Sequence, residues 1–173
     1  MSRFQYLFAF AIVLSSCAKS APPKPKPGDW AKREIEGVTL DAPYALTANP
    51  KPLPGWVNIA SYMPANSPHA VEIRIDVIQQ LAGKKEPTLD QFAQDLFTTT
   101  DEKTSEPIAP ALTNAKIGDL EARKHSTQSK EKVYIDSITF KKGKYFWLIE
   151  VFYSDKSLAT DAKRIIDSIR VEK

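Results

Sequence analysis

The chain has 173 residues, enough for one domain with short extensions, and its 24 basic and 21 acidic residues give a net charge of +3. Four positive charges lie near the N-terminus, on Arg3, Lys19, Lys24 and Lys26, so the rest of the chain is close to neutral. A nucleic-acid-binding domain usually carries a strongly basic surface, so we expect no nucleic-acid partner. The single cysteine, Cys17, excludes an internal disulfide and a cysteine-rich metal site.

The first 16 residues have the layout of a secretory signal peptide. Arg3 supplies a positive start, and the apolar run Tyr6–Leu14 is too short for a membrane-spanning helix, which needs about 20 residues. The small residues Ser15 and Ser16 then complete the pattern. Two other interpretations stay open, an ordinary signal peptide with a coincidental cysteine and an uncleaved membrane anchor.

Leu14, Ser15, Ser16 and Cys17 resemble the lipobox of bacterial lipoproteins, in which an aliphatic and two small residues precede an invariant cysteine. The resemblance implies that residues 1–16 are a lipoprotein signal peptide and that the Cys17 thiol is linked to diacylglycerol. It also implies cleavage before Cys17 and acylation of the new amine. For a Gram-negative source, Ala18 implies transfer to the outer membrane, with the protein facing the periplasm.

Residues 17–28 are then the lipidated cysteine and a tether rich in proline and lysine. The prolines of Ala18–Gly28 favour polyproline II, in which eleven residues span about 34 Å. Lys24 and Lys26 either contact anionic headgroups or are simply solvated.

We expect a single domain over residues 29–173. The alternation of Val71, Ile73, Ile75 and Val77 with polar residues predicts a strand over Ala70–Gln79. Gly37–Leu46 predicts a short strand that runs into a turn at Pro43. Further strands are expected, in chain order, over Trp56–Met63, Ala70–Gln79, Lys116–Thr127, Lys132–Phe140, Lys144–Tyr153 and, at the end, residues 170–173.

Two segments have the spacing of amphipathic helices. In Thr88–Phe97 the apolar residues share one face, and Thr88 with Gln91 forms a capping box. A second apolar stripe lies in Ser157–Ile169. Between them, the polar, proline-containing stretch Thr98–Thr113 predicts a long surface loop. Lys144–Tyr153 is apolar on both faces and is expected to be a central strand.

The order strands, helix, strands, helix predicts an α+β fold with an antiparallel β-sheet flanked by helices. The motifs GVTLDAPYAL, TLDQFAQDLF, GKYFWLIEVFY and DAKRIIDSIRVEK resemble the PsbP-like family over Gly37–Lys173. That family includes a photosystem II subunit and small bacterial lipoproteins. The resemblance implies a PsbP-like αβα sandwich and a role in binding proteins or assembling complexes.

A few polar and aromatic residues are candidates for a pocket or a partner surface. Glu150 interrupts an apolar strand, so it either marks a pocket with a raised pKa or pairs with a basic residue. Glu72, Arg74 and Asp76 share one strand face, as a recognition surface or as a solvated face with ion pairs. Trp56 either lines an exposed groove or packs in the core.

The two histidines, His69 and His125, either meet at a metal site or are unrelated surface residues. We found no metalloprotease, nucleophile-elbow or phosphate-loop motif, so we expect no enzyme activity and no cofactor. The leading hypothesis is a lipid-anchored periplasmic lipoprotein that binds a protein partner or supports assembly of an envelope complex. The alternative is a small-ligand carrier or sensor with a pocket between sheet and helix near Glu150.

Overall fold

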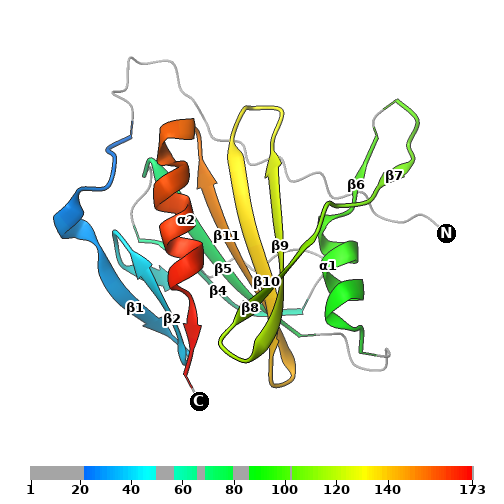
Figure 1. Ribbon diagram of the computed structural model, residues 1–173, viewed down its shortest axis with the longest axis horizontal. Helices are drawn as coiled ribbons and strands as arrows, with labels where there is room; N and C mark the ends of the chain where they lie inside the picture. Colours follow the sequence, from blue (N-terminus) through cyan, green and yellow to red (C-terminus); the bar gives the residue numbers. More distant parts are fainter. Residues whose placement is uncertain (1–21, 50–56, 66–68, 80–85, 102, 173) are drawn as a thin grey trace.

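A seven-stranded antiparallel sheet forms the centre of the computed structural model, which describes residues 22–49, 57–65, 69–79, 86–101 and 103–172 (Figure 1). In spatial order its strands are β3 (Leu46–Ala48), β4 (Val57–Pro64), β5 (Val71–Gln79), β11 (Tyr145–Tyr153), β10 (Tyr134–Lys142), β9 (Leu120–Gln128) and β8 (Thr113–Ile117). The aromatic strand β11 lies between β5 and β10, which confirms the prediction of a central strand.

The remaining elements are short. A three-stranded sheet has the order β1 (Ala31–Ile35), β2 (Val38–Ala42) and β12 (Arg170–Val171), and a two-stranded one pairs β6 (Thr99–Thr100) with β7 (Pro107–Ile108). The helices of the described residues are α1 (Leu89–Phe97) and α2 (Ala159–Ser168), with 3-10 turns η1 (Pro27–Asp29) and η2 (Lys156–Leu158). None of these helices is long and apolar enough to cross a membrane.

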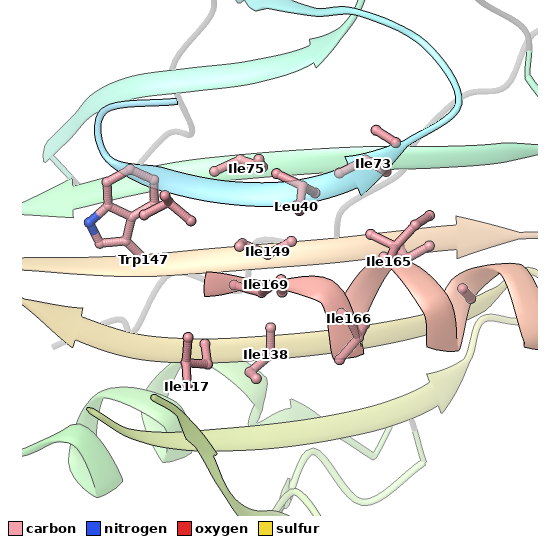
Figure 2. Packing of buried hydrophobic residues seen from close by; sticks show 14 of the residues in the cluster. Leu40, Ile73, Ile75, Ile117, Ile138, Trp147, Ile149, Ile165, Ile166 and Ile169 are labelled. Atoms are coloured by element: carbon pink, nitrogen blue, oxygen red, sulfur yellow. The ribbon is translucent and has the colours of Figure 1, made fainter. Parts of the chain in front are cut away.

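The main core lies between one face of the long sheet, the helix α2 and the strand β2. Alternating strand residues such as Ile73, Ile75 and Ile149 point to this face. Ile165 of α2 and Ile169, which follows the helix directly, pack onto them. Figure 2 shows Leu40 of β2 among the same side chains. Burial of this apolar surface supplies the main driving force for folding.

The opposite face of the long sheet carries a second, smaller apolar cluster. Ile78, Phe146 and Leu148 point to this face, and Phe92 of α1 stacks on Phe146 with ring centroids 4.2 Å apart. The capping box that begins α1 is confirmed, because Thr88 Oγ1 accepts from the Gln91 amide at 3.2 Å and Gln91 Oε1 accepts from the Thr88 amide at 2.9 Å.

The prediction of an αβα sandwich with helices flanking the sheet is wrong. The molecule is mostly antiparallel β-sheet, and its described part has two α-helices. The helix α2 shares its face of the long sheet with β1, β2 and β12, whereas α1 packs near β9 and β10 at one side of the molecule (Figure 1). The sequence analysis missed β1 because its residues, AKREI, carry little apolar signal.

Two further expectations need correction. The segment Lys116–Thr127 is not one strand, because the chain turns at Gly118, whose φ of +58° favours glycine, and continues as β9. The expected loop Thr98–Thr113 contains the short pair β6 and β7 and the first residue of β8. The strands β10 and β11 form a hairpin whose turn contains Gly143, with φ +59°.

The described end of the expected tether lies against the domain. The Pro23 carbonyl accepts from the Ala70 amide at 3.4 Å, and Lys24 Nζ lies 3.1 Å from Asp155 Oδ2 and 2.8 Å from Ser157 Oγ. Trp30 follows, with the Arg164 guanidinium 4.1 Å from its ring centroid. The chain is therefore in contact with the domain from Pro23 onward.

Candidate functional site

A line of polar side chains crosses four neighbouring strands on the α1 side of the long sheet. The strand register places Arg74 of β5 opposite Glu150 of β11, Glu150 opposite Ser137 of β10, and Ser137 opposite His125 of β9. Directly opposed residues in antiparallel strands have Cβ atoms about 5 Å apart, so each side chain is beside the next. We call these four residues the polar row.

An ion pair lies at the β5 end of the polar row. Arg74 Nε is 2.7 Å from Oδ2 of Asp76, two residues further along the same face of the strand. Both side chains are buried, with relative exposures of 8% for Arg74 and 0% for Asp76. Removing two charges from water is costly, and the close contact of opposite charges offsets that cost.

Glu150 is the second carboxylate beside Arg74. Burial raises the pKa of Glu150 from 4.5 to about 7, against the opposing effect of Arg74. The nearby Asp76 carboxylate raises the pKa further, and a hydrogen bond from Ser137 lowers it. One guanidinium faces two carboxylates here, so the second carboxylate is the one that takes up a proton as the pH falls through neutrality.

The polar row can therefore exchange a proton near neutral pH inside a largely buried site. With Glu150 protonated, Arg74 and Asp76 form a neutral pair. With Glu150 ionised, the site carries one net negative charge. Such a site could bind a ligand or a positively charged group of a partner through Glu150. It does not favour an anion, because its net charge is zero or negative in both protonation states.

The far end of the polar row meets the C-terminal end of α1. The ring of His125 lies 4.8 Å from that of Phe97, and its Nδ1 lies 3.3 Å from the Ala111 carbonyl oxygen. Two residues before His125 on the same face of β9, Arg123 forms an ion pair with Asp90 of α1 and holds the pKa of that carboxyl below its usual range.

An open groove lies beside these residues, at the edge of the sheet. It is lined by Asn114, Ala115, Lys116, Glu121 and Arg123, from β8 and β9. Glu150 does not line this groove. This groove is therefore not the pocket that was predicted near Glu150.

The structure brings three of the predicted site residues together and separates others from them. Arg74 and Asp76 are buried, and Glu150, which is partly buried, lies beside Arg74 in the strand register. Glu72 is partly buried on the same face, where its Oε1 accepts from the His69 amide at 3.5 Å. Cys17 and Trp56 lie outside the described residues.

The two histidines do not meet. His69 precedes β5 and stacks on Tyr44 with centroids 4.3 Å apart, whereas His125 lies on β9, and β11 and β10 separate the two strands. The described residues contain no group of three or more histidine, cysteine or acidic residues arranged to hold a metal ion.

The sequence analysis missed Ser137 and considered His125 only as a possible metal ligand. Both residues join the polar row through the strand register, which was not predicted. A signal for Ser137 was present in the sequence. In the segment SITF, Ser137 and Thr139 alternate with Ile138 and Phe140, which indicates that the two polar residues lie on the opposite face of the strand from the main core.

The comparisons with known proteins give no family. No family model matches the chain, and no curated protein matches it. Among solved structures, it is similar to a crystal structure of a protein of unknown function from Pseudomonas aeruginosa, with 13% identity and a TM-score of 0.33. That alignment covers 77% of this chain and 88% of the other, and at this TM-score it carries no argument.

Proposed function

We propose that this protein is a lipid-anchored envelope lipoprotein without enzymatic activity, whose domain binds a protein partner. The observation that carries the proposal is the stretch Leu14-Ser15-Ser16-Cys17, followed by a tether that joins the domain at Pro23. Two or more acyl chains hold a protein stably on a membrane, whereas one chain binds reversibly. The cell compartment that follows is the outer membrane, facing the periplasm.

The anchor is tested by Cys17→Ala in the full chain. We expect the variant to leave the membrane fraction or to keep its signal peptide, because it lacks the thiol that receives the lipid. Ser16→Ala is the matched control, since it keeps a small residue before the cysteine and leaves membrane association unchanged. A Cys17→Ala protein that is processed normally and stays in the membrane would contradict the proposal.

The edge strand β8 is the surface that we assign to the partner. It is the last strand of the long sheet, so one of its edges pairs with no other strand of that sheet. Thr113, Asn114 and Lys116 are exposed on it, and the groove runs beside it. An extended segment of another protein can add to such an edge through backbone hydrogen bonds.

Crosslinking from β8 tests the partner surface. A photoreactive amino acid at Asn114 is expected to capture one specific protein in intact cells. The same group at Lys144, exposed on the β10–β11 turn, serves as the control. Equal capture from both positions, or none from Asn114, would contradict the assignment.

A small-ligand carrier or sensor is the second candidate function. The observation that favours it is the polar row, with Glu150 raised to a pKa of about 7 beside buried Arg74. Native mass spectrometry of protein extracted from envelopes is expected to find a bound small molecule that Glu150→Gln loses. A spectrum that contains only the lipidated chain would contradict this candidate.

A further inference from the structure

Several loops leave the long sheet at the same end. The last paired residues there are Val71 of β5, Tyr153 of β11, Tyr134 of β10 and Gln128 of β9, which lie side by side in register. The segments 129–133 and 154–158 therefore emerge next to each other. We call this the tether end of the domain.

The N-terminal segment reaches the domain at this tether end. Pro23 is hydrogen-bonded to Ala70, the residue before Val71, and Lys24 contacts Asp155 and Ser157 in the segment after β11. In Figure 1 the first coloured residues of the chain lie near the N-terminal end of α2, which follows the same segment. The lipid anchor at Cys17 is therefore joined to the domain from this end.

The length of free chain limits how far the tether end can stand from the anchor. Cys17 is six residues from Pro23, which is about 19 Å at ~3.1 Å per residue in polyproline II. Without the contacts of Pro23 and Lys24, the free chain would extend to Trp30, about 40 Å. Because these contacts are made, the tether end is held close to the bilayer surface.

The charge at the tether end suits an anionic surface. The exposed acidic residues at this end are Asp29, which accepts from the Lys26 amide, Glu131 and Asp155. They are outnumbered by five exposed lysines, which leaves two positive charges: Lys24, Lys26, Lys130, Lys132 and Lys156. The opposite end of the sheet, around the turns at Gly118 and Gly143, is balanced, with Lys116, Lys141, Lys142 and Lys144 against Glu36, Glu86, Asp119 and Glu121. Lysines near an anionic bilayer are attracted to it within about a Debye length.

The geometry points to a membrane-docking surface: the tether end of the domain lies on the bilayer, with its lysines against anionic headgroups. This inference rests on the proposed lipid anchor, because the short chain from Cys17 is what brings the surface to the membrane. The nine-residue strands span about 30 Å, so the far end, with the turns at Gly118 and Gly143, stands away from the bilayer.

Fluorescence energy transfer to acceptor lipids tests the orientation. The mature lipidated protein is reconstituted in phosphatidylglycerol–phosphatidylcholine vesicles that contain an acceptor lipid. Its own thiol is occupied by lipid, so a donor can be attached at Ser154→Cys, at the tether end, or at Asp119→Cys, at the far end. Both positions are exposed. We expect the transfer efficiency from position 154 to be about twofold or more that from position 119, given the ~30 Å between the two ends.

Charge variants separate the electrostatic contribution from the anchor. Lys132→Gln with Lys156→Gln is expected to reduce the difference in transfer between the two label positions in anionic vesicles. Lys116→Gln with Lys144→Gln is the matched control at the far end and leaves the difference unchanged. Raising the salt concentration should reproduce the effect of the first pair of substitutions.

The outcomes distinguish this inference from the proposed function. Lipid on the Cys17 peptide, shown by mass spectrometry, together with equal transfer from both labels would overturn the docking surface and leave the anchor intact. Equal effects of the two lysine pairs would also overturn it. Absence of lipid from Cys17 would overturn the anchor and the docking surface together.

Discussion

Replacing Glu150 by glutamine should stabilise the protein at alkaline pH and leave its stability almost unchanged at acid pH. The substitution keeps the size of the side chain and a hydrogen bond to Ser137, and it removes the second carboxylate beside Arg74. Arg74 keeps Asp76 as its ion-pair partner at 2.7 Å. The change therefore removes a buried negative charge without leaving the guanidinium uncompensated.

The sign and size follow from the pKa of Glu150. Burial raises this pKa from 4.5 in the unfolded chain to about 7 in the fold, so between these values the folded state binds more protons than the unfolded one. The free energy of unfolding of the natural protein therefore falls as the pH rises through this window. At about 1.4 kcal/mol per pH unit, the loss reaches roughly 3 kcal/mol above pH 7, as an upper value, and it is absent below pH 4.5.

Urea denaturation followed by tryptophan fluorescence, between pH 4.5 and 8.5, measures the effect. We expect the free energy of unfolding of Glu150→Gln to exceed that of the natural protein by up to ~3 kcal/mol at pH 8. Near pH 4.5 the two free energies should be equal. Glu121→Gln removes an exposed carboxylate and controls for the change in net charge. If the natural protein and Glu150→Gln keep a constant difference across the whole range, the assignment of Glu150 as a buried titrating group is wrong.

Two further substitutions test the buried ion pair and the smaller core cluster. Asp76→Ala should lower the free energy of unfolding by up to about 3–5 kcal/mol, because Arg74 loses its buried ion-pair partner, and ionisation of the neighbouring Glu150 offsets part of that loss. In the same urea assay, the exposed Asp95→Ala should cost less than about 0.5 kcal/mol, and equal losses would contradict the burial of the pair. Phe92→Ala should cost about 3–5 kcal/mol and lower the melting temperature, since Phe92 is fully buried against Phe146. An unchanged melting temperature would show that α1 does not anchor this face.

The strands with strong alternation were the most predictable part of the fold. Ala70–Gln79 was expected from its period-two pattern and became β5, while the pattern and capping residues of Thr88–Phe97 predicted α1 within one residue. These signals are local, so the sequence alone carries them. The prediction of an αβα sandwich was wrong because the polar strand β1 was not recognised, and because no local pattern shows that β1 and β12 pair with β2 in a separate sheet.

The polar row shows the limit of reading residues one strand at a time. Arg74 and Asp76 were seen on one strand and Glu150 on another, but their contact depends on which strands are neighbours and in which register. Similarly, the contact of Lys24 with Asp155 joins residues far apart in the chain. Long-range pairing of this kind is decided by the packing of the whole domain, which composition and periodicity do not describe.

The small sheet β1–β2–β12 pairs strands that lie far apart in the sequence. The hairpin β1–β2 is made well before its partner β12 and the neighbouring helix α2, which lie far along the chain from it. The Glu172 amide donates to the Gly37 carbonyl at 2.9 Å, and Ser168 Oγ accepts from the Asp41 amide at 2.7 Å.

Closure of this sheet must therefore wait until nearly the whole chain is available. Contacts of such large sequence separation slow folding, because the loop-closure entropy is lost before the contacts form. A nascent chain therefore cannot complete this sheet before residues 170–171 have been made. The small sheet, and with it the native domain, is completed only when Arg170 and Val171 pair with β2.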